Sequence, residues 1–120
     1  SATLAAVPDI LFDVDHEGRF YQVHRRPETQ LYLEPEQFIG KTAQQVLPEQ
    51  VSRAMQIAIA QAYDNQGCSD AQQYALTIGR ATEPSWFQVI AALKPARPAP
   101  TIKTSEELGM SSDNPCLINY

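Results

Sequence analysis

The hydrophobic pattern between Phe38 and Tyr63 predicts a long, one-sided helix. Apolar side chains recur there at spacings of three and four, the period that places them on one face of an α-helix. They are Val51, Ala54, Met55, Ala58, Ile59 and Ala62. Pro48 suits the start, where its missing N–H would be unpaired anyway, and Gly67 is a usual stop. A helix that is apolar on one side needs a partner layer, and the flanking segments predict a sheet.

Four segments show the two-residue alternation of strands. They are residues 10–15, 20–25, 72–78 and 86–93, and alternate side chains in each should share a face. A turn at residues 15–18, with Gly18 available for a positive φ, joins the first two into a hairpin. In the fourth segment an entirely apolar set, which we expect to face inward, alternates with a mixed set. The apolar set is Phe87, Val89, Ala91 and Leu93, and the mixed set is Trp86, Gln88, Ile90 and Ala92.

The connections are polar and proline-rich. Residues 27–36 predict a loop with short helical turns. Gly40 marks a backbone bend, and Thr42 with Gln45 has the spacing of a capping box for a short helix. The order of strands and helices predicts an α+β fold with an antiparallel sheet covered on one face. We expect a flank at 1–8, a domain at 9–94 and a Pro/Ser-rich segment at 95–120.

Four stretches of the sequence resemble PAS sensor domains. Residues 8–20, Pro-Asp-Ile-Leu-Phe-Asp-Val-Asp-His-Glu-Gly-Arg-Phe, look like the opening of that fold. The entry into the long helix of that fold is similar to Phe38-Ile-Gly-Lys-Thr followed by Val46-Leu-Pro. Its third and fourth strands are similar to Gln73-Tyr74 and Trp86-Phe87. The resemblance covers residues 4–94. It implies about five antiparallel strands, with one long helix and short helices on one face.

A PAS domain also has a central fifth strand, often followed by an Asp-Ile-Thr signature that this sequence lacks. Thr101–Thr104 and Cys116–Tyr120 are both candidates for that strand. The resemblance implies a non-enzymatic sensor for signal transduction that binds a small ligand or a partner, in a cytoplasmic or membrane-tethered regulatory protein. Its output domain, such as the histidine kinase of a two-component system or a diguanylate cyclase, would lie outside this chain. Two alternatives stay open: a small enzyme similar to ketosteroid isomerase, and a purely structural dimerisation module.

The predicted ligand pocket lies where the helix stripe meets the inward strand faces. Its residues are Met55, Ile59, Tyr74, Leu76, Phe87 and Val89. The same residues could simply fill a core. An enzyme of the alternative type needs an acid or tyrosine of raised pKa in an apolar pocket, and Tyr74 is the only inward candidate. We expect no visible absorption band, because residues 42–66 contain no histidine to bind haem and no Asn-Cys-Arg-Phe flavin motif is present.

The remaining chemistry-bearing residues favour ordinary structural roles. We expect His16 and His24 to be solvated, no metal to be bound and no catalytic group. Asp13 and Asp15 share one face of the first strand, and we expect both to face water. Cys68 and Cys116 are too few for a disulfide framework and predict two free thiols. The formal net charge of -5 argues against nucleic acid.

Trp86 and Ile90 place two large apolar side chains on the outer face of the fourth strand. A monomer rarely leaves such a patch uncovered. Either Ser1–Val7 or Pro95–Pro115 covers it, or a second copy of the chain does. We favour a homodimer with Trp86 and Ile90 in its interface.

Overall fold

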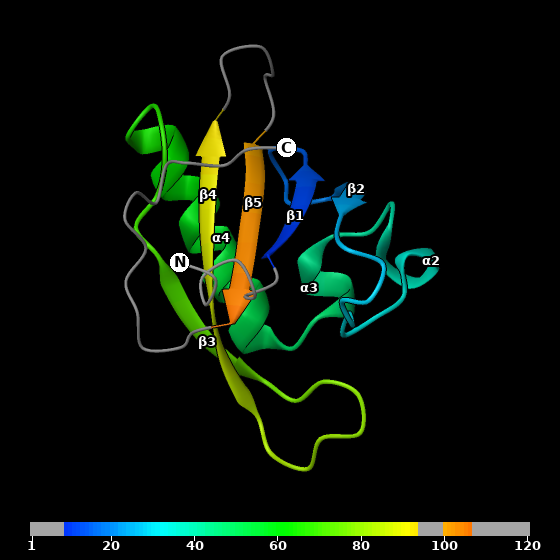
Figure 1. Cartoon of the computed structure of the whole chain (residues 1–120). Helices are drawn as coiled ribbons and strands as arrows, with labels where there is room; N and C mark the ends of the chain where they lie inside the picture. Colours follow the sequence, from blue (N-terminus) through cyan, green and yellow to red (C-terminus); the bar gives the residue numbers. More distant parts are fainter. Residues whose placement is uncertain (1–8, 94–99, 107–120) are drawn as a thin grey trace.

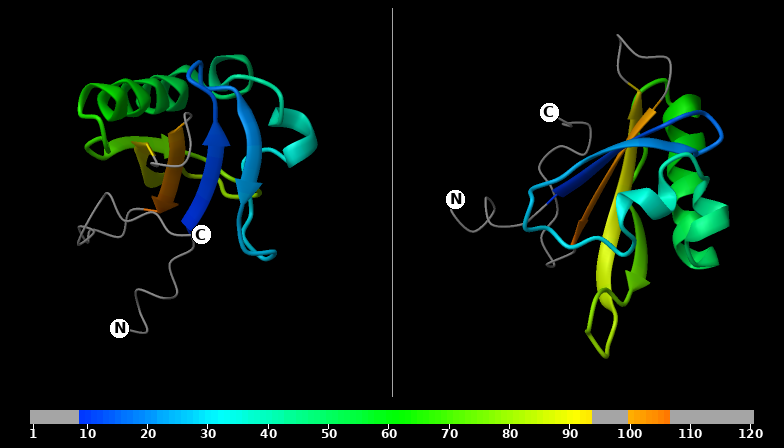
Figure 2. Two further views of the ribbon diagram at one scale, coloured as in Figure 1. Left: turned by 90° about the horizontal axis from the view of Figure 1, so that it is seen from above. Right: turned by 90° about the vertical axis from the view of Figure 1, so that its right-hand side faces the viewer.

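The computed structural model describes residues 9–93 and 100–106. It contains an antiparallel sheet with helices on one face, as Figure 2 shows in two views. The elements are β1 (Asp9–Val14), β2 (Phe20–His24), α2 (Pro35–Phe38), α3 (Ala43–Val46), α4 (Glu49–Asp64), β3 (Gln72–Leu76), β4 (Ser85–Leu93) and β5 (Pro100–Glu106). The predicted α+β class, the hairpin and the long helix are confirmed, with boundaries shifted by one or two residues at most ends.

The fifth strand answers the question that the sequence left open. The strand order is β2-β1-β5-β4-β3, so β5 lies in the middle of the sheet between β1 and β4 (Figure 1). Its register pairs Ile102 with Phe12 of β1 and with Ala91 of β4. Residues 100–106 therefore complete the sheet, and the sheet extends past the boundary expected at residue 94. The other candidate, Cys116–Tyr120, lies outside the described residues.

Helix α4 begins and ends close to the predicted positions. Pro48 is its N-cap. At its end Gln66 takes a positive φ of 54°, and the Gly67 N–H donates to the Ala62 carbonyl at 3.0 Å. A non-glycine residue thus holds the left-handed position and Gly67 follows it. The predicted stripe is buried as expected: Val51, Ala54, Met55, Ala58, Ile59 and Ala62 are each at most 7% exposed.

The short elements between β2 and α4 are set by local hydrogen bonds. Thr42 caps α3 through a capping box with Gln45, as predicted. Gly40 takes a φ of 88°, which favours glycine. The backbone of residues 40–41 also bonds that of Phe20, with Gly40 N–H donating to the Phe20 carbonyl at 2.7 Å. These bonds hold the α2–α3 segment against the outer edge of β2.

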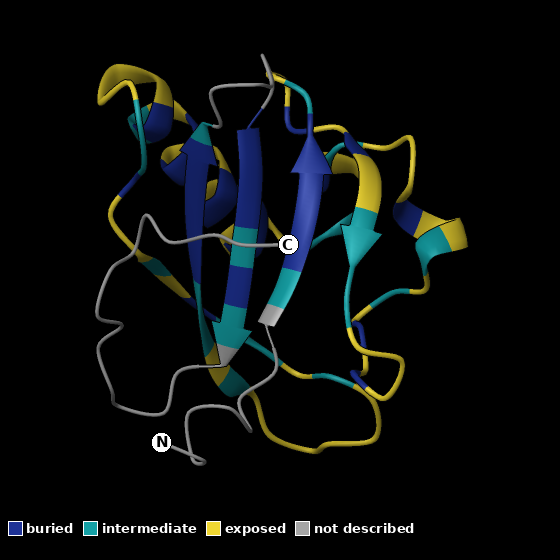
Figure 3. Ribbon diagram, turned by 45° about the horizontal axis from the view of Figure 1, so that its top comes forward, coloured by how far each residue is buried: buried dark blue, intermediate teal, exposed yellow. Residues whose placement is uncertain are grey.

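The main core lies between α4 and the inner face of the sheet. Phe12, Val14, Val89, Ala91 and Ile102 supply the sheet side. Burial is deepest in the three central strands, whereas the edge strands β2 and β3 carry exposed positions, as does β4 at Trp86 (Figure 3). Within the described residues, no helix is long and apolar enough to cross a bilayer.

Candidate functional site

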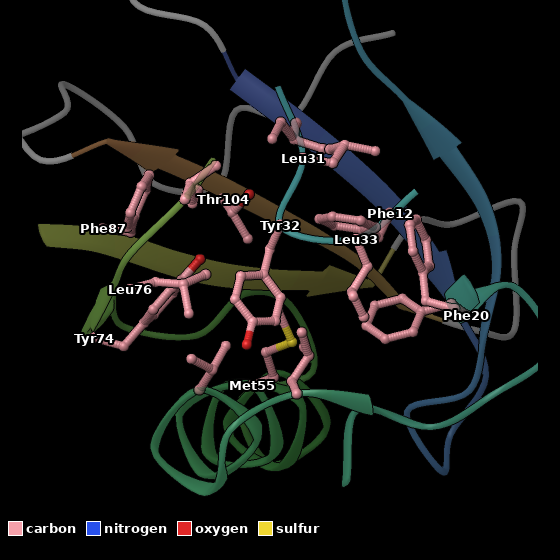
Figure 4. A pocket seen from close by; sticks show the side chains of 15 residues that line it. Phe12, Phe20, Leu31, Tyr32, Leu33, Met55, Tyr74, Leu76, Phe87 and Thr104 are labelled. Atoms are coloured by element: carbon pink, nitrogen blue, oxygen red, sulfur yellow. The ribbon is translucent and has the colours of Figure 1, made fainter. Parts of the chain in front are cut away.

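A cavity of about 70 Å³ lies between α4 and the inner face of the sheet. One water needs only ~10–15 Å³ of such space, so the cavity holds more than one or two waters. Its walls come from every strand, from α2 and α4, and from the loop after β2 (Figure 4). The lining residues are Ile10, Phe12, Phe20, Leu31, Tyr32, Leu33, Phe38, Leu47, Val51, Met55, Tyr74, Leu76, Ile78, Phe87 and Thr104.

Two aromatic groups form opposite walls of the cavity. Phe12, Phe20 and Phe38 pack edge to face or tilted, with ring centroids 5.3–5.8 Å apart. Tyr74 stacks on Phe87 across β3 and β4 at 5.6 Å. Such pairs stabilise by about 0.5–1.5 kcal/mol beyond the area they bury. The rings are thus fixed by their partners, and they hold the side walls in place.

The loop after β2 supplies a wall of a different kind. Leu31, Tyr32 and Leu33 are successive residues in irregular backbone, and all three line the cavity. Leu31 is buried, but Tyr32 is 40% exposed. In Figure 4 the Tyr32 ring lies between the side chains of β1 and β2 on one side and those of β3 on the other. Tyr32 therefore faces both the cavity and solvent.

The polar part of the lining is a pair of hydroxyl groups. The Tyr74 side chain hydrogen-bonds the Thr104 side chain of β5. Burial raises the pKa of the Tyr74 phenol far above its ordinary value, and the Thr104 bond offsets only part of that rise. Tyr74 therefore stays neutral at physiological pH. The lining contains no Asp, Glu, Lys, Arg or His.

Four of the six residues predicted for the pocket line this cavity. They are Met55, Tyr74, Leu76 and Phe87. Ile59 and Val89 are buried in the core but do not line it. Ile59 instead lies near the β1–β2 turn, because its Cδ1 is 3.8 Å from where a Cβ on Gly18 would stand.

Sequence reasoning missed most of the remaining lining. The three residues Leu31–Leu33 are an apolar run inside a polar, proline-rich segment, and that run was a usable signal. Phe12 and Phe20 belong to predicted strands, but the register that brings their rings together was not readable. Thr104 could not be assigned to the lining, because the sequence left open which segment forms the fifth strand.

The outer face of the sheet corrects the expectation for the acidic and histidine side chains. Asp13 is 0% exposed, not solvated. Its Oδ1 accepts from the Thr101 hydroxyl at 3.2 Å, and its Oδ2 lies 3.1 Å from Nε2 of His24. Charged groups are buried only with partners, and this strand provides them across β5 and β2. His24 is thus paired and only partly exposed, whereas His16 is exposed as expected.

Asp15 has a local structural role. Its Oδ1 accepts the backbone N–H groups of Glu17 and Arg19, both at 2.9 Å. This pattern is an Asx turn, which shapes the connection between β1 and β2. Gly18 in that turn has the positive φ that the sequence predicted, 84°.

The outer positions Trp86 and Ile90 differ sharply. Trp86 is 54% exposed but Ile90 is 3% exposed within the single chain, so Ile90 is not the open surface that we expected. The alternation predicted its side of the sheet correctly but could not show whether that side was covered. Residues 100–106 of one expected cover form β5 itself. The other parts of both expected covers lie outside the described residues.

The prediction of two free thiols is wrong. Cys68 is disulfide-bonded, and no free cysteine occurs among the described residues. The only other cysteine in the sequence, Cys116, lies outside the described residues. Spacing alone could not reveal this bond, because pairing depends on distance in space. Among the described residues, no cluster of three or more His, Cys, Asp or Glu side chains could hold a metal ion.

Comparison with known proteins agrees with this architecture. A family model described as PAS fold matches residues 4–95. The chain belongs to the PAS-fold family. The match spans β1 to β4 but ends before β5, so the central strand is the part that sequence comparison alone would leave out. No curated protein matches the sequence closely enough to be counted as a relative. A PAS domain indicates a sensory or signalling module.

Proposed function

We propose that this PAS domain is a non-enzymatic sensor that binds a small molecule between α4 and the sheet. The cavity carries the proposal, because it is apolar, lined from all five strands and large enough for several waters. Ligand sites are usually concave and apolar with a few polar groups, and the Tyr74–Thr104 pair supplies such groups. The bound molecule would change how α4 packs on the sheet, and an output domain outside this chain would respond.

The lining favours binding over catalysis. An isomerase of the alternative type needs a base to remove a proton as well as a donor to stabilise the resulting charge. Tyr74 is a suitable neutral donor, but no carboxylate or histidine lines the cavity. Asp13, the one fully buried carboxylate in the described part of the chain, lies on the opposite face of the sheet. We therefore propose recognition without chemistry.

Native mass spectrometry of protein purified from cells tests the function. The expected result is a mass above that of the chain, lost on denaturation. Leu76→Trp should abolish the extra mass, since it fills the cavity from β3. Gln73→Trp is the matched control, because Gln73 is exposed on the same strand. Apo protein in every preparation, or equal retention by both variants, contradicts the proposal. No visible haem or flavin band is expected.

The partners remain proposals. The output domain would be a histidine kinase or a diguanylate cyclase, and self-association would use Trp86. Light scattering on the wild type and on Trp86→Ser tests the dimer. Trp86 is chosen rather than Ile90, because a change at a side chain that is 3% exposed would disturb the monomer. A wild type that is monomeric at tens of micromolar contradicts the dimer.

The cytoplasmic location also stays a prediction, and Cys68 offers its test. Disulfides persist in oxidising compartments and are rare in the cytosol. A cytoplasmic protein should therefore carry reduced Cys68 in the cell, although the structure has it disulfide-bonded. Thiol labelling in intact cells distinguishes reduced from disulfide-bonded Cys68. Protection of Cys68 from the reagent until a reductant is added contradicts a cytoplasmic location.

A further inference from the structure

We propose that the cavity selects an uncharged, mainly apolar molecule with one hydrogen-bond acceptor, which meets the Tyr74–Thr104 pair after Tyr32 moves aside. This inference rests on the proposed function and names the ligand class that the site accepts. It follows from three features of the lining: its lack of charge, one unused donor hydrogen and one weakly held wall.

Charge is excluded by the composition of the walls. The lining contains no Asp, Glu, Lys, Arg or His, and burial raises the pKa of the Tyr74 phenol, so that Tyr74 is neutral. An ionised carboxylate or ammonium would lose its hydration without gaining an opposite charge. That loss is strongly unfavourable in an apolar interior.

The acceptor requirement follows from counting hydroxyl hydrogens. A tyrosine and a threonine hydroxyl bring two donor hydrogens. Their mutual bond uses one of them. The other has no partner among the described residues, so a carbonyl, ether or hydroxyl oxygen of a ligand can accept it. Thr104 lies on the central strand β5, so this contact would reach the middle of the sheet.

The size of the cavity requires a wall to move. At about 70 Å³ it is smaller than the ~150 Å³ cavity that admits benzene in an engineered protein. The weakest wall is Leu31–Leu33, which makes no backbone hydrogen bond with other described residues. Exposed segments with few backbone bonds open at the lowest free energy. Tyr32, 40% exposed, is therefore the side chain to be displaced.

Neighbouring contacts define the hinge of this movement. On the N-terminal side, the loop is fixed by Thr29, whose N–H bonds the Arg26 carbonyl at 3.0 Å and whose carbonyl accepts Nη1 of Arg25 at 2.9 Å. Gln30 packs against Gly79, where an added Cβ would stand 2.6 Å from its Nε2. On the C-terminal side, Glu34 caps α2. Leu31 between these anchors is packed in the core, so the movement is confined to the exposed Tyr32 side chain and leaves both anchors in place.

Three probes with one ring skeleton test the selection: toluene, benzyl alcohol and benzoate. The methyl group of Met55 is the reporter, because it lines the cavity and the sequence contains only two methionines. Benzyl alcohol and toluene should shift its NMR signal at saturable concentrations, and benzoate should not. Benzoate binding as tightly as benzyl alcohol overturns the proposal.

Tyr74→Phe tests the acceptor. A neutral hydrogen bond contributes about 0.5–1.5 kcal/mol, so the affinity for benzyl alcohol relative to toluene should fall about threefold to tenfold. Tyr63→Phe makes the same change at an exposed tyrosine of α4 and should leave this ratio unchanged. Thr104→Val alone would leave the Tyr74 O–H as a donor, so the second variant is Tyr74→Phe combined with Thr104→Val, which removes both donor hydrogens. An unchanged ratio in this double variant overturns the proposal, and the benzoate comparison on the wild type decides if neither variant folds.

Tyr32→Ala tests the route. Association and dissociation of toluene should both become faster. The ratio of the affinity for benzyl alcohol to that for toluene should stay as in the wild type. Tyr21→Ala, at an exposed tyrosine of β2, should leave both rates unchanged. Failure of all probes overturns the ligand class, but a molecule retained from cells would still support the proposed function. Wild-type protein that retains no molecule from cells would contradict the proposed function, whatever these probes show.

Discussion

The two faces of the sheet bury their residues by different means. On the inner face, Phe12 packs among rings and lines an uncharged cavity. Its neighbour in β1, Asp13, is also buried but lies on the outer face, where Thr101 and His24 satisfy its carboxylate. One face is held by apolar packing and the other by specific polar pairs. The comparison teaches that two-residue alternation predicts the side of a residue, not the environment on that side.

The largest effect is expected on the inner face, at Ile59→Ala. Removing buried methylene and methyl groups from a packed site costs about 2–5 kcal/mol, because lost burial and a residual cavity add. Ile59 is 7% exposed on the core face of α4. Urea unfolding measures the change. Arg53→Ala, on the exposed side of the same helix, should stay within about 0.5 kcal/mol, and equal effects would show that the buried face is misassigned.

The next effect is on the outer face, at Asp13→Ala. It would leave the Thr101 hydroxyl and the His24 ring without the carboxylate they contact. An unsatisfied buried polar group costs about 1–3 kcal/mol. Urea unfolding should show this loss, with Asp64→Ala at the exposed end of α4 as a near-neutral control. A negligible loss at Asp13 would mean that the polar pairs do not stabilise the outer face.

A smaller effect comes from the titration of Tyr74. Burial raises its folded-state pKa above the ordinary 10.0, so the unfolded state loses the phenol proton first as pH rises. This contribution to stability is complete below pH 10 and falls above it. The wild type should lose roughly 1 kcal/mol more than Tyr74→Phe between pH 10 and 11. Parallel stability profiles for the two proteins would place Tyr74 outside a desolvated site.

The smallest effect is expected at Trp86→Ala. Trp86 is 54% exposed, so the free energy of unfolding of the monomer should change by no more than about 0.5 kcal/mol. Ile90→Ala, on the same face of the same strand but 3% exposed, should cost about 2–5 kcal/mol. Thermal unfolding at low protein concentration compares them. Similar losses would mean that the outer face is covered uniformly.

Periodicity was sufficient for most of the fold. The apolar stripe located the buried face of α4, and the alternation in β4 located Phe87, Val89 and their neighbours on the inner face. Capping chemistry at Thr42 and the glycine at position 18 predicted two local structures. These features depend on residues close in sequence, so the sequence alone can reveal them.

The rest depends on contacts between distant residues. The position of β5 brings Thr104 beside Tyr74 and Thr101 beside Asp13, and residues 95–115 carry no period to predict it. The cavity also needs Leu31–Leu33, whose backbone is irregular. Burial of Ile90 and the bond at Cys68 likewise depend on tertiary neighbours. The sequence thus indicated two walls of the site but not its polar pair or the wall formed by Leu31–Leu33.

A benzyl alcohol titration followed at both faces of the sheet shows whether the ligand enters between α4 and the sheet. Met55 reports on the inner face, and Trp86, the only tryptophan in the sequence, reports on the outer face. We expect a saturable shift of the Met55 methyl signal while the Trp86 indole N–H signal stays in place. A Trp86 shift with Met55 unmoved, or no saturable shift at either residue, would contradict this expectation.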